Sequence, residues 1–466
     1  MTESFSALLD AAARRRTDAP ALVWDGGSLT WRELELRAGG AARRLSRRGV
    51  RAGDTVALLL PNGWGFVAAL WGTLKLGATA VPLNPLLSPD ERDRVLAHLG
   101  PALVVDELSG SEEAMWDSAD GNAPALILYT SGSTGQPRGA VLSHAALRAA
   151  NESWAGPVMR LTPQEVVLAV LPLAHSFGLN GALLAPLLAG ATVALCERFV
   201  PEAALRAISR HRVTVFPAVA TMFQRMLELP ELSRATCSTL RIAVSGAAPC
   251  PWELAEAWRL RTGVRIVRGY GMTELFRPIS YLADDPTDLK DAIGRPVPGV
   301  EVRVVDEDGR PLGAGEPGEL LIHTPAAMDG YLRAEEETRA VLRDGWFRTG
   351  DLGTVSSGGF VSVVGRKKDL ILRGGYSVAP GEVEAALMAH PSVAEAAVIG
   401  TPDAVLGEEI AAFVILRPGA RVDAPELVEF CRERLATFKY PRRVSIVTEL
   451  PRSATGKVLK WRLGSL

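Results

Sequence analysis

Cysteine and net charge are the two properties that this sequence has little of. Its 466 residues include four cysteines, Cys196, Cys237, Cys250 and Cys431, and none of them forms a C-x-x-C pair. This spacing indicates neither a disulfide framework nor a zinc site, and it fits a reducing cytoplasm. The formal net charge is −2, which excludes the strongly basic surface that proteins use to bind nucleic acid or an anionic membrane.

Long hydrophobic runs are also missing. The N-terminal segment MTESFSALLDAAARRR lacks the apolar core of a signal peptide. The most apolar window, Gly181 to Cys196, is interrupted by Pro186 and Gly190 and falls short of the ~20 apolar residues that span a bilayer. We therefore expect a cytoplasmic protein without a membrane span, in which this window folds as a buried helix, a turn and a strand.

The order of helical and extended segments predicts an α/β multidomain fold. Up to about residue 240, helical segments alternate with near-continuous apolar runs such as ALILYT, EVVLAVLPL and RIAVSG. Such runs are typical of parallel strands covered on both faces, and they are numerous enough for two doubly wound sheets. Segment 30–49 is predicted to be an amphipathic helix that ends at Gly49, because Leu34, Ala38 and Leu45 share a face.

The pattern changes twice further along the chain. From about residue 290 to 365, short alternating segments and the turn DEDG predict a β-rich, barrel-like subdomain of the large N-terminal domain. After the charged run GRKKD, mixed helices and strands predict a small C-terminal α+β domain. The predicted domains are therefore residues 1–367 and 368–466.

The segment YTSGSTGQPRGAVLSH, Tyr129 to His144, follows an apolar strand, at the edge where ligands bind in α/β sheets. Its glycines allow turns that point successive N–H groups at an anion, while hydroxyl groups and Arg138 add donors and a positive charge. It is not a Walker A motif, because no Ser or Thr follows the basic residue. A polyphosphate site and a Ser/Gly-rich surface linker both remain open for this segment alone.

Four further regions follow in order: LPLAHSFGLN (171–180), RGYGMTE (268–274), RTGDLG with GRKKDLILRGGYSVAPGEVE (348–353 and 365–384), and LPRSATGKVLK (450–460). Together with the loop, they resemble the adenylate-forming superfamily of acyl-CoA synthetases, peptide-synthetase adenylation domains and luciferases, over nearly the whole chain. The resemblance implies a two-step reaction. A carboxylate attacks the α-phosphate of MgATP to give an acyl-adenylate and pyrophosphate, and a thiol then displaces AMP.

The resemblance also implies how the nucleotide is bound. Tyr270 stacks on adenine, and Asp351 accepts hydrogen bonds from both ribose hydroxyls beside Arg366. The loop holds the β- and γ-phosphates, and Arg138 stands where the family generally has lysine, a change that we expect to affect the rate of the first step. The residues implied for ATP and AMP are Thr130, Ser131, Gly132, Ser133, Thr134, Gly135, Arg138, Gly246, Ala247, Ala248, Tyr270, Gly271, Met272, Asp351 and Arg366.

By the same resemblance, catalysis depends on Lys457, Glu274, Thr273 and His175. Lys457 bridges the substrate carboxylate and the α-phosphate oxygens in the first step. Thr273 and Glu274 lie near the α-phosphate, and Glu274 is the expected Mg²⁺ ligand. Between the half-reactions the small domain rotates about Lys368, which withdraws Lys457. The segment that then lines a coenzyme A channel is Arg373, Gly374 and Gly375.

The acid is expected to lack an α-amino group, because LPLAHSFGLN contains no aspartate to pair with an ammonium. An aryl, fatty or alicyclic acid fits the mostly apolar pocket that the resemblance implies. Its residues are His175, Phe177, Ala220, Met222, Gly246, Gly271, Met272, Phe276 and Arg277. Arg277 either pairs with a second carboxylate or polar group of the substrate or, as we expect, points to solvent.

Free coenzyme A is the expected thiol, since no carrier domain follows Lys457 in the sequence. A stand-alone ligase that loads a separate carrier protein is the alternative. We expect a monomer or homodimer without a nucleic-acid partner. Two other classes stay open: a kinase or NTPase, which releases ADP or phosphate, and a catalytically degenerate nucleotide-binding protein, which the arginine at position 138 suggests.

We expect Lys457→Ala to suppress ATP–pyrophosphate exchange that depends on a carboxylic acid, because this lysine acts only in the first half-reaction. Thiolation of a supplied acyl-adenylate should be spared. Both rates are measured on one preparation. Equal loss of both rates contradicts the scheme in which the small domain rotates and withdraws Lys457 between the half-reactions.

Overall fold

A computed structural model of the chain describes residues 4–108, 113–119, 121, 124–131, 137–285, 289–374, 376–452 and 458–465. The chain divides into two compact units. The first comprises Met1–Val302 and Ile322–Phe347, and the second comprises Arg303–Leu321 and Arg348–Leu466. Both units mix helices and strands, which confirms the predicted α/β multidomain class. The domain boundary after residue 367 stays a prediction.

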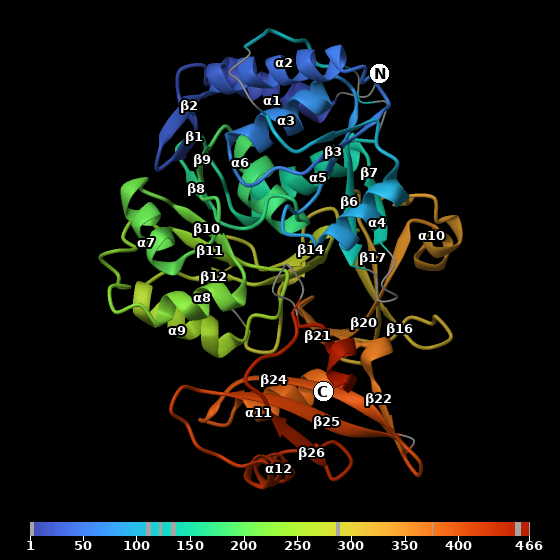
Figure 1. Ribbon diagram of the computed structural model, residues 1–466. Helices are drawn as coiled ribbons and strands as arrows, with labels where there is room; N and C mark the ends of the chain where they lie inside the picture. The colour runs from blue at the N-terminus through green and yellow to red at the C-terminus, as the bar shows by residue number, and fades with distance from the viewer. Residues whose placement is uncertain are drawn as a thin grey trace. The chain divides into compact units, whose positions relative to one another are not determined.

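The larger sheet of the first unit has seven strands in the order β12-β11-β10-β8-β9-β1-β2, and of these pairs only β1–β2 is antiparallel (Figure 1). The interior strands β9, β10 and β11 are buried along their whole length, as their apolar runs predict. The strands are β1 (Pro20–Trp24), β2 (Gly27–Thr30), β8 (Val166–Ala169), β9 (Thr192–Leu195), β10 (Val215–Ala218), β11 (Ile242–Ser245) and β12 (Ile266–Val267).

A second sheet in the same unit has six strands in the order β18-β7-β6-β4-β3-β5. The pairs formed by β3, β4, β5 and β6 are parallel, whereas β7 and β18 are added antiparallel. The predicted pair of sheets is therefore confirmed. The strands are β3 (Thr55–Leu58), β4 (Thr79–Pro82), β5 (Leu103–Val105), β6 (Leu126–Ser131), β7 (Pro137–Leu142) and β18 (Gly330–Tyr331).

Helices pack on these sheets, and α2 follows the predicted pattern. It begins with a capping box between Thr30 and Glu33 and ends before Gly49, whose φ is 94°. The helices of the first unit are α1 (Phe5–Arg15), α2 (Trp31–Arg47), α3 (Trp64–Lys75), α4 (Pro89–Leu99), α5 (His144–Ser153), α6 (Ala185–Leu188), α7 (Pro201–Arg210), α8 (Ala220–Leu227), α9 (Trp252–Thr262) and α10 (Glu335–Val341).

Two π-helical segments, η1 (Trp154–Val158) and η2 (Gly178–Leu184), extend α5 and precede α6. The apolar window 181–196 contains the end of η2, all of α6 and β9, and Gly190 at a φ of 74° between helix and strand. This confirms the predicted buried helix, turn and strand. Among the residues that the structure describes, we find no helical segment with the length and hydrophobicity that a membrane span requires.

A short antiparallel sheet, β13 (Gly269–Met272), β14 (Phe276–Ser280) and β15 (Arg295–Pro296), completes the first unit, and β19 (Leu342–Arg343) pairs there with the start of β20. In the remaining β-rich segment β21 pairs with β20. The strands of that segment are β16 (Glu301–Val305), β17 (Gly318–His323), β20 (Trp346–Val355) and β21 (Val361–Arg366).

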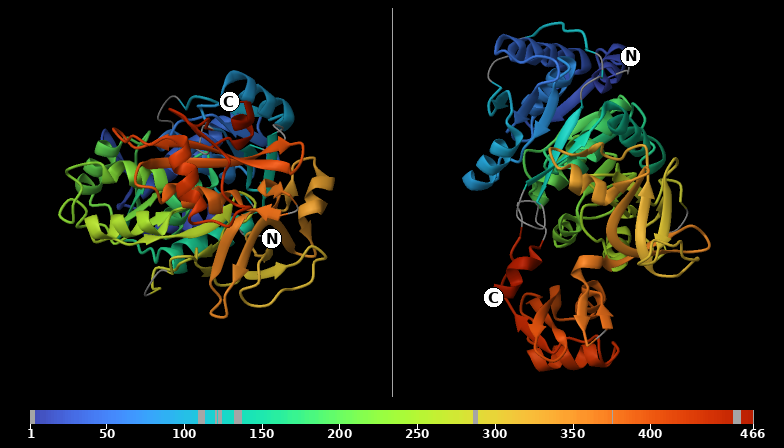
Figure 2. Two further views of the ribbon diagram at one scale, coloured as in Figure 1. Left: turned by 90° about the horizontal axis from the view of Figure 1, so that it is seen from below. Right: turned by 90° about the vertical axis from the view of Figure 1, so that its right-hand side faces the viewer.

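The C-terminal part of the second unit is a five-stranded sheet in the order β23-β22-β25-β24, with β26 also on β25. Helices α11 and α12 pack against β24 and β26, in the orange to red part of Figure 2. This sheet and its helices match the predicted α+β pattern. The elements are η3 (Lys367–Asp369), β22 (Ile371–Arg373), β23 (Tyr376–Val378), α11 (Pro380–Met388), β24 (Val393–Asp403), β25 (Gly407–Leu416), α12 (Ala424–Arg432), β26 (Arg443–Ile446) and η4 (Lys460–Ser465).

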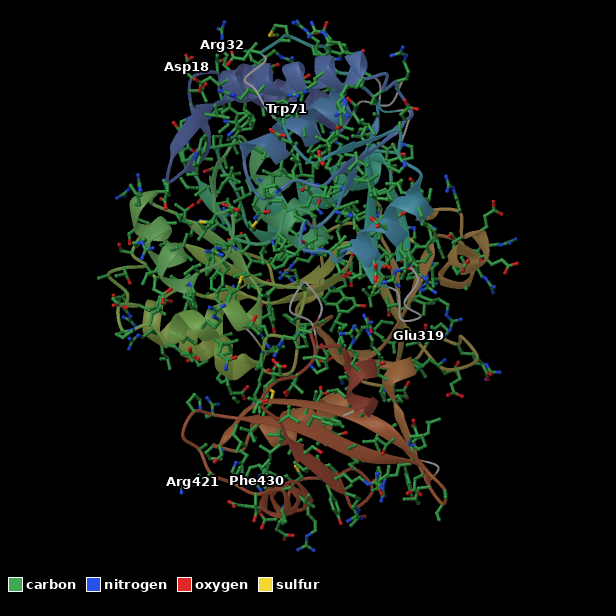
Figure 3. The ribbon with its side chains drawn as sticks, viewed as in Figure 1. Asp18, Arg32, Trp71, Glu319, Arg421 and Phe430 are labelled. Atoms are coloured by element: carbon green, nitrogen blue, oxygen red, sulfur yellow. The ribbon has the colours of Figure 1, made fainter. Side chains whose placement is uncertain are left out.

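Helices α2 and α3 approach closely beside the buried Trp71, which Figure 3 labels. Gly72 makes this approach possible. A Cβ at position 72 would lie 2.6 Å from the Ala38 carbonyl oxygen and 2.7 Å from the Ala41 Cβ. Because backbone atoms of α2 cannot move aside cheaply, the packing depends on a residue without a side chain.

Gly72→Ala is expected to lower the free energy of unfolding by about 1–3 kcal/mol, because the new methyl group forces α2 and α3 apart. Gly156→Ala is the matched control, since a Cβ there would meet nothing within 4 Å. Urea unfolding of both variants measures the difference. Equal stabilities of the two variants would show that the helices adjust without cost.

Candidate active site

The predicted phosphate loop connects the two strands of a hairpin. Strands β6 and β7 are antiparallel, and Thr130 lies opposite Arg138 in their register. Half-buried Arg138 extends over the ring of Tyr331, with 5.8 Å between its Cζ and the ring centroid. Gly132, Ser133, Thr134 and Gly135 lie outside the described residues, as does the side chain of Ser131.

Tyr331 connects the loop arginine to Glu274, the predicted Mg²⁺ ligand. Its hydroxyl donates a hydrogen bond to Glu274 Oε1 over 2.8 Å. Burial, followed by the charge of Glu274 and this hydrogen bond, raises the pKa of Tyr331, so the hydroxyl remains a donor. Sequence reasoning missed Tyr331. In the sequence, Tyr331 stands in the segment MDGYL, which does not by itself indicate a functional residue. In the structure this segment contains β18, and Tyr331 pairs with Ala140 of β7.

The turn after β11 is held in a conformation that side chains rarely adopt. Gly246 is buried, and Ala247 has a φ of 63°, while Ala247 and Ala248 are exposed. An alanine at positive φ costs of order 1 kcal/mol and is retained only where its surroundings fix it. The turn thus presents backbone and methyl groups, which suits the predicted contact with a flat base.

The segment GYGMTE forms the tight hairpin of β13 and β14. A bulge falls between Tyr270 and Met272, and Met272 pairs with Phe276. A Cβ on Gly271 would lie 1.9 Å from the Phe276 carbonyl oxygen, and Phe276 itself has a φ of 56°. The hairpin therefore requires glycine at position 271. Thr273 and Glu274 occupy its turn, half-buried.

Arg277 does not point to solvent, and that expectation was wrong. Its side chain is buried. Neutral acceptors at the ends of three strands hold the guanidinium there. Nη1 donates to the Ser245 carbonyl over 2.7 Å, Nη2 to the Val267 carbonyl over 3.2 Å, and Nε to Ser280 Oγ over 2.9 Å. Burial lowers the pKa of Arg277 to about 9, so it stays positively charged at neutral pH.

Aromatic rings stack beside this buried cation. The Cζ of Arg277 lies 5.0 Å from the centroid of the Trp154 ring, and Trp154 is stacked on Phe177 at 5.6 Å. A Cβ on Gly246 would lie 3.2 Å from Arg277 Nη1 and 3.2 Å from Phe177 Cε1. The structure thus brings three predicted pocket residues, Gly246, Phe177 and Arg277, into one wall together with Trp154.

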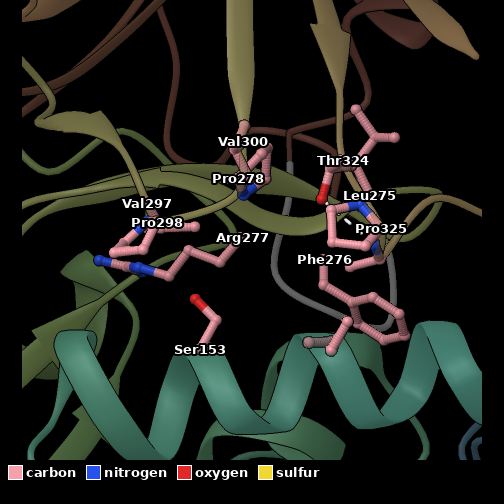
Figure 4. A pocket seen from close by; sticks show the side chains of 13 residues that line it. Ser153, Leu275, Phe276, Arg277, Pro278, Val297, Pro298, Val300, Thr324 and Pro325 are labelled. Carbon is pink, nitrogen blue, oxygen red and sulfur yellow. Dashed lines mark hydrogen bonds between the residues drawn. The ribbon is translucent and has the colours of Figure 1, made fainter.

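A small cavity, partly open to solvent, lies beside β14. Figure 4 shows Ser153 of α5 pointing toward Arg277 across it. Besides α5, residues 275–278, 297–300 and 324–326 line the cavity. Phe276 and Arg277 are the predicted pocket residues that border it. Ala220 is buried in α8, and Met222 packs against the hydrophobic core of the seven-stranded sheet.

His175 follows β8 and is half-buried. Its Nε2 lies 3.1 Å from Nδ2 of Asn84, which follows β4 of the other sheet. Burial lowers the pKa of His175 to about 4, and the imidazole is therefore neutral at physiological pH. Asn84 is a second residue that sequence reasoning missed, although it stands in the segment VPLNP.

In the second unit, the predicted ribose residues face each other. Asp351 on β20 is the register partner of Arg366 on β21, and Arg366 Nε lies 2.8 Å from Asp351 Oδ1. The Asp351 side chain is 3% exposed and the Arg366 side chain 40% exposed. A buried carboxylate fixed by a partly exposed arginine is suited to accept hydrogen bonds from hydroxyl groups.

The predicted hinge and coenzyme A residues are only partly described. Lys457 and Gly375 lie outside the described residues, as does the side chain of Lys368. Gly374 has a φ of 58°, and Arg373 forms a bidentate ion pair with Glu409, at 2.6 and 2.9 Å. The Arg373 guanidinium is therefore held within the small sheet.

Known proteins share this architecture. The AMP-binding enzyme family matches residues 9–332, and its C-terminal domain matches residues 382–457. The chain belongs to this family.

Individual relatives cover both chains almost completely. A feruloyl-CoA synthase from Amycolatopsis sp. is 37% identical over 96% of this chain and 96% of its own. A long-chain-fatty-acid–CoA ligase from Yersinia pestis is 32% identical over 98% of this chain and 93% of its own. The ATP-bound crystal structure of MatB from Rhodopseudomonas palustris superposes with a TM-score of 0.94 and 32% identity, over 100% and 99% of the two chains.

These matches confirm the predicted class of enzyme. The protein is an acyl-CoA synthetase, an acid–thiol ligase. The two doubly wound sheets and the small C-terminal domain are the architecture of this family.

Arg277→Met should lower the free energy of unfolding by about 2–4 kcal/mol, because it leaves the Ser245 and Val267 carbonyls without their donor. Arg225→Met is the matched control, since exposed Arg225 only lies over the Phe199 ring at 5.4 Å, and its effect should stay within about 0.5 kcal/mol. Urea unfolding measures both. Similar small effects would mean that the buried guanidinium is dispensable for the fold.

Proposed function

We propose that this AMP-binding enzyme activates a non-amino carboxylic acid as its acyl-adenylate and transfers the acyl group to free coenzyme A. The observation that carries the proposal is the chain of contacts Arg138–Tyr331–Glu274. It joins the basic residue of the phosphate loop to a carboxylate suited to a magnesium ion. A guanidinium and a carboxylate linked in this way match the charges of a polyphosphate and its counter-ion.

The residues present fit a Mg²⁺–nucleotide complex. Glu274 supplies hard oxygen atoms, and Tyr331 fixes the carboxylate through Oε1. When bound, the magnesium ion would neutralise charge on the phosphates. Asp351, buried and paired with Arg366, fits the ribose hydroxyls, and the small residues after β11 fit the approach of the base.

In the first step, a carboxylate oxygen of the acid attacks the α-phosphorus, and the bond between this phosphorus and the bridging oxygen to the β-phosphorus breaks. Arg138 stabilises the negative charge on the departing pyrophosphate. We assign to Lys457 the role of stabilising the negative charge that develops between the carboxylate and the α-phosphate. Thr273 lies beside Glu274 in the turn of the β13–β14 hairpin, and it completes the α-phosphate site.

In the second step, the sulfur of coenzyme A attacks the acyl carbon, the bond to the AMP oxygen breaks, and the thiol proton is released. We assign the pivot between the two steps to Lys368 and the pantetheine channel to the segment 373–375. The ion pair between Arg373 and Glu409 supports a structural role for this arginine, which leaves the channel to the glycine backbone.

The substrate pocket is proposed to hold an aryl, fatty or alicyclic acid. The wall of Phe177, Trp154 and Arg277 supports an acid whose ring or chain packs on planar groups. A second carboxylate on the acid remains an alternative, because a guanidinium has five N–H donors and Arg277 uses three on the protein. If Arg277→Met leaves the ratio of rates for hexanoate and adipate unchanged, Arg277 does not recognise a second carboxylate.

A screen of carboxylic acids for pyrophosphate release tests the proposal. AMP and pyrophosphate should form in equal amounts, and acyl-CoA should accumulate steadily with free coenzyme A. Release of ADP or phosphate supports a kinase or NTPase instead. If the acyl-adenylate forms but is consumed only when a carrier protein is added, the acceptor is a carrier protein and not free coenzyme A. If no acid supports ATP–pyrophosphate exchange, the protein is a catalytically degenerate nucleotide-binding protein.

Glu274→Gln should reduce acid-dependent ATP–pyrophosphate exchange by about 100-fold or more, because the variant keeps the hydrogen bond from Tyr331 but loses the negative charge. Glu256→Gln is the matched control. Glu256 pairs with Arg259 on the surface of α9, and its replacement should leave the exchange rate unchanged. Raising the Mg²⁺ concentration should partly restore the exchange rate of the Glu274→Gln variant. Equal exchange rates for the two variants would exclude a role for Glu274.

A further inference from the structure

His175 and Asn84 come from loops of different sheets and meet in one hydrogen bond. Asn84 lies two residues after β4 and is 5% exposed. Its Nδ2 lies 3.1 Å from His175 Nε2, and this is the only side-chain hydrogen bond of His175 in the described part of the chain. The protonation of His175 therefore depends on the direction of this bond.

The orientation of the Asn84 amide settles that direction. The backbone N–H of Leu86 donates to Asn84 Oδ1 over 2.9 Å. A backbone N–H can only donate, so the atom that it meets is the amide oxygen, and the atom that faces His175 is the NH₂ group. An NH₂ group can only donate as well. Nε2 of His175 must accept, and in a neutral ring the proton then lies on Nδ1.

We propose that Asn84 is a positioning residue that holds His175 as the neutral Nδ1–H tautomer, so that Nδ1–H is a constant hydrogen-bond donor to the carboxylate of the acid. The tautomer follows from the two hydrogen bonds, whereas the donor role rests on the proposed function. A neutral donor can orient a carboxylate without protonating it. The carboxylate must stay ionised, because its oxygen is the nucleophile of the first step.

The surroundings of His175 support this assignment. Burial is the one cause that lowers its pKa, and no charged side chain of the described residues shifts it further. A second asparagine fixes the backbone before it. Asn62 donates through Nδ2 to the Leu171 carbonyl over 2.8 Å and accepts from the Leu173 N–H over 2.9 Å. Asn62 thus holds the segment, and Asn84 holds the ring.

The tautomer is measured without substrate, by two-bond ¹⁵N–¹H correlation spectra of protein labelled at its six histidines. The spectrum of His175→Gln assigns the signal. His144 and His390 are internal references of the opposite form, because their Nδ1 atoms accept from the backbone N–H groups of Phe5 and Ser392, at 3.0 and 3.2 Å. We expect the proton of His175 on Nδ1 and those of the references on Nε2. A proton on Nε2 of His175 overturns the proposal.

The donor role is tested with Asn84→Asp, which keeps the acceptor for Leu86 but can no longer donate to Nε2. In this variant Nε2–H donates to the carboxylate, and Nδ1 carries a proton only when the ring is doubly protonated. Nδ1–H is then present below the raised pKa of His175 and lost above it. The value of kcat/KM for the acid in pyrophosphate exchange should fall with rising pH, by up to about 10-fold per pH unit.

Asn62→Asp is the matched control. It places a carboxylate beside the Leu171 and Cys196 carbonyls, which lowers stability without touching the ring of His175. Its pH profile should run parallel to that of the unchanged protein. Parallel profiles for Asn84→Asp and the unchanged protein overturn the donor role. If no acid is activated at all, the proposed function fails, while the spectra still decide the tautomer.

Discussion

A buried arginine without a carboxylate partner among the described residues is the constraint on which much of the site depends. The guanidinium of Arg277 is held by the Ser245 and Val267 carbonyls and by Ser280. A charge in the interior is tolerated only where hydrogen-bond acceptors surround it, so the three strand ends that accept from Arg277 are fixed relative to one another. The chain segments that follow Ser245 and Val267 are two of those proposed to bind the nucleotide. Arg277 thus links the stability of the sheet to the geometry of the site.

The remainder of the first-unit site is assembled by side chains that cross between strands far apart in the sequence. Tyr331 reaches Glu274 from β18, and Asn84 reaches His175 from the loop after β4. Each contact satisfies a polar group that is at least partly removed from water, which is the condition under which a hydrogen bond also fixes orientation. Glu274 and His175 have different electrostatic surroundings. Glu274 lies near the basic loop residue, whereas burial and an amide keep His175 neutral.

Two residues of the site have strained backbone conformations. Ala247 and Phe276 have φ values of 63° and 56°, and Gly271 passes so close to the Phe276 carbonyl that any side chain would collide with it. Such conformations are unfavourable in isolation and persist because the surrounding sheet fixes them. In the second unit, the positions of the predicted ribose residues are fixed by strand register, since β20 and β21 pair Asp351 directly with Arg366.

The sequence by itself determined the fold class and the family, because these depend on local periodicity and on motifs read along the chain. The helix predicted over residues 30–49, which is α2 (Trp31–Arg47) in the structure, and the small C-terminal α+β domain came from such patterns. Only the tertiary structure decided how distant side chains are paired. Arg277 looked like a surface residue because it has no acidic partner within the described ranges, and two of its three acceptors are backbone carbonyls, which carry no sequence signal. Tyr331 and Asn84 were missed for a related physical reason: their partners, Glu274 and His175, lie in loops far away along the chain, and no local pattern records a hydrogen bond between such segments.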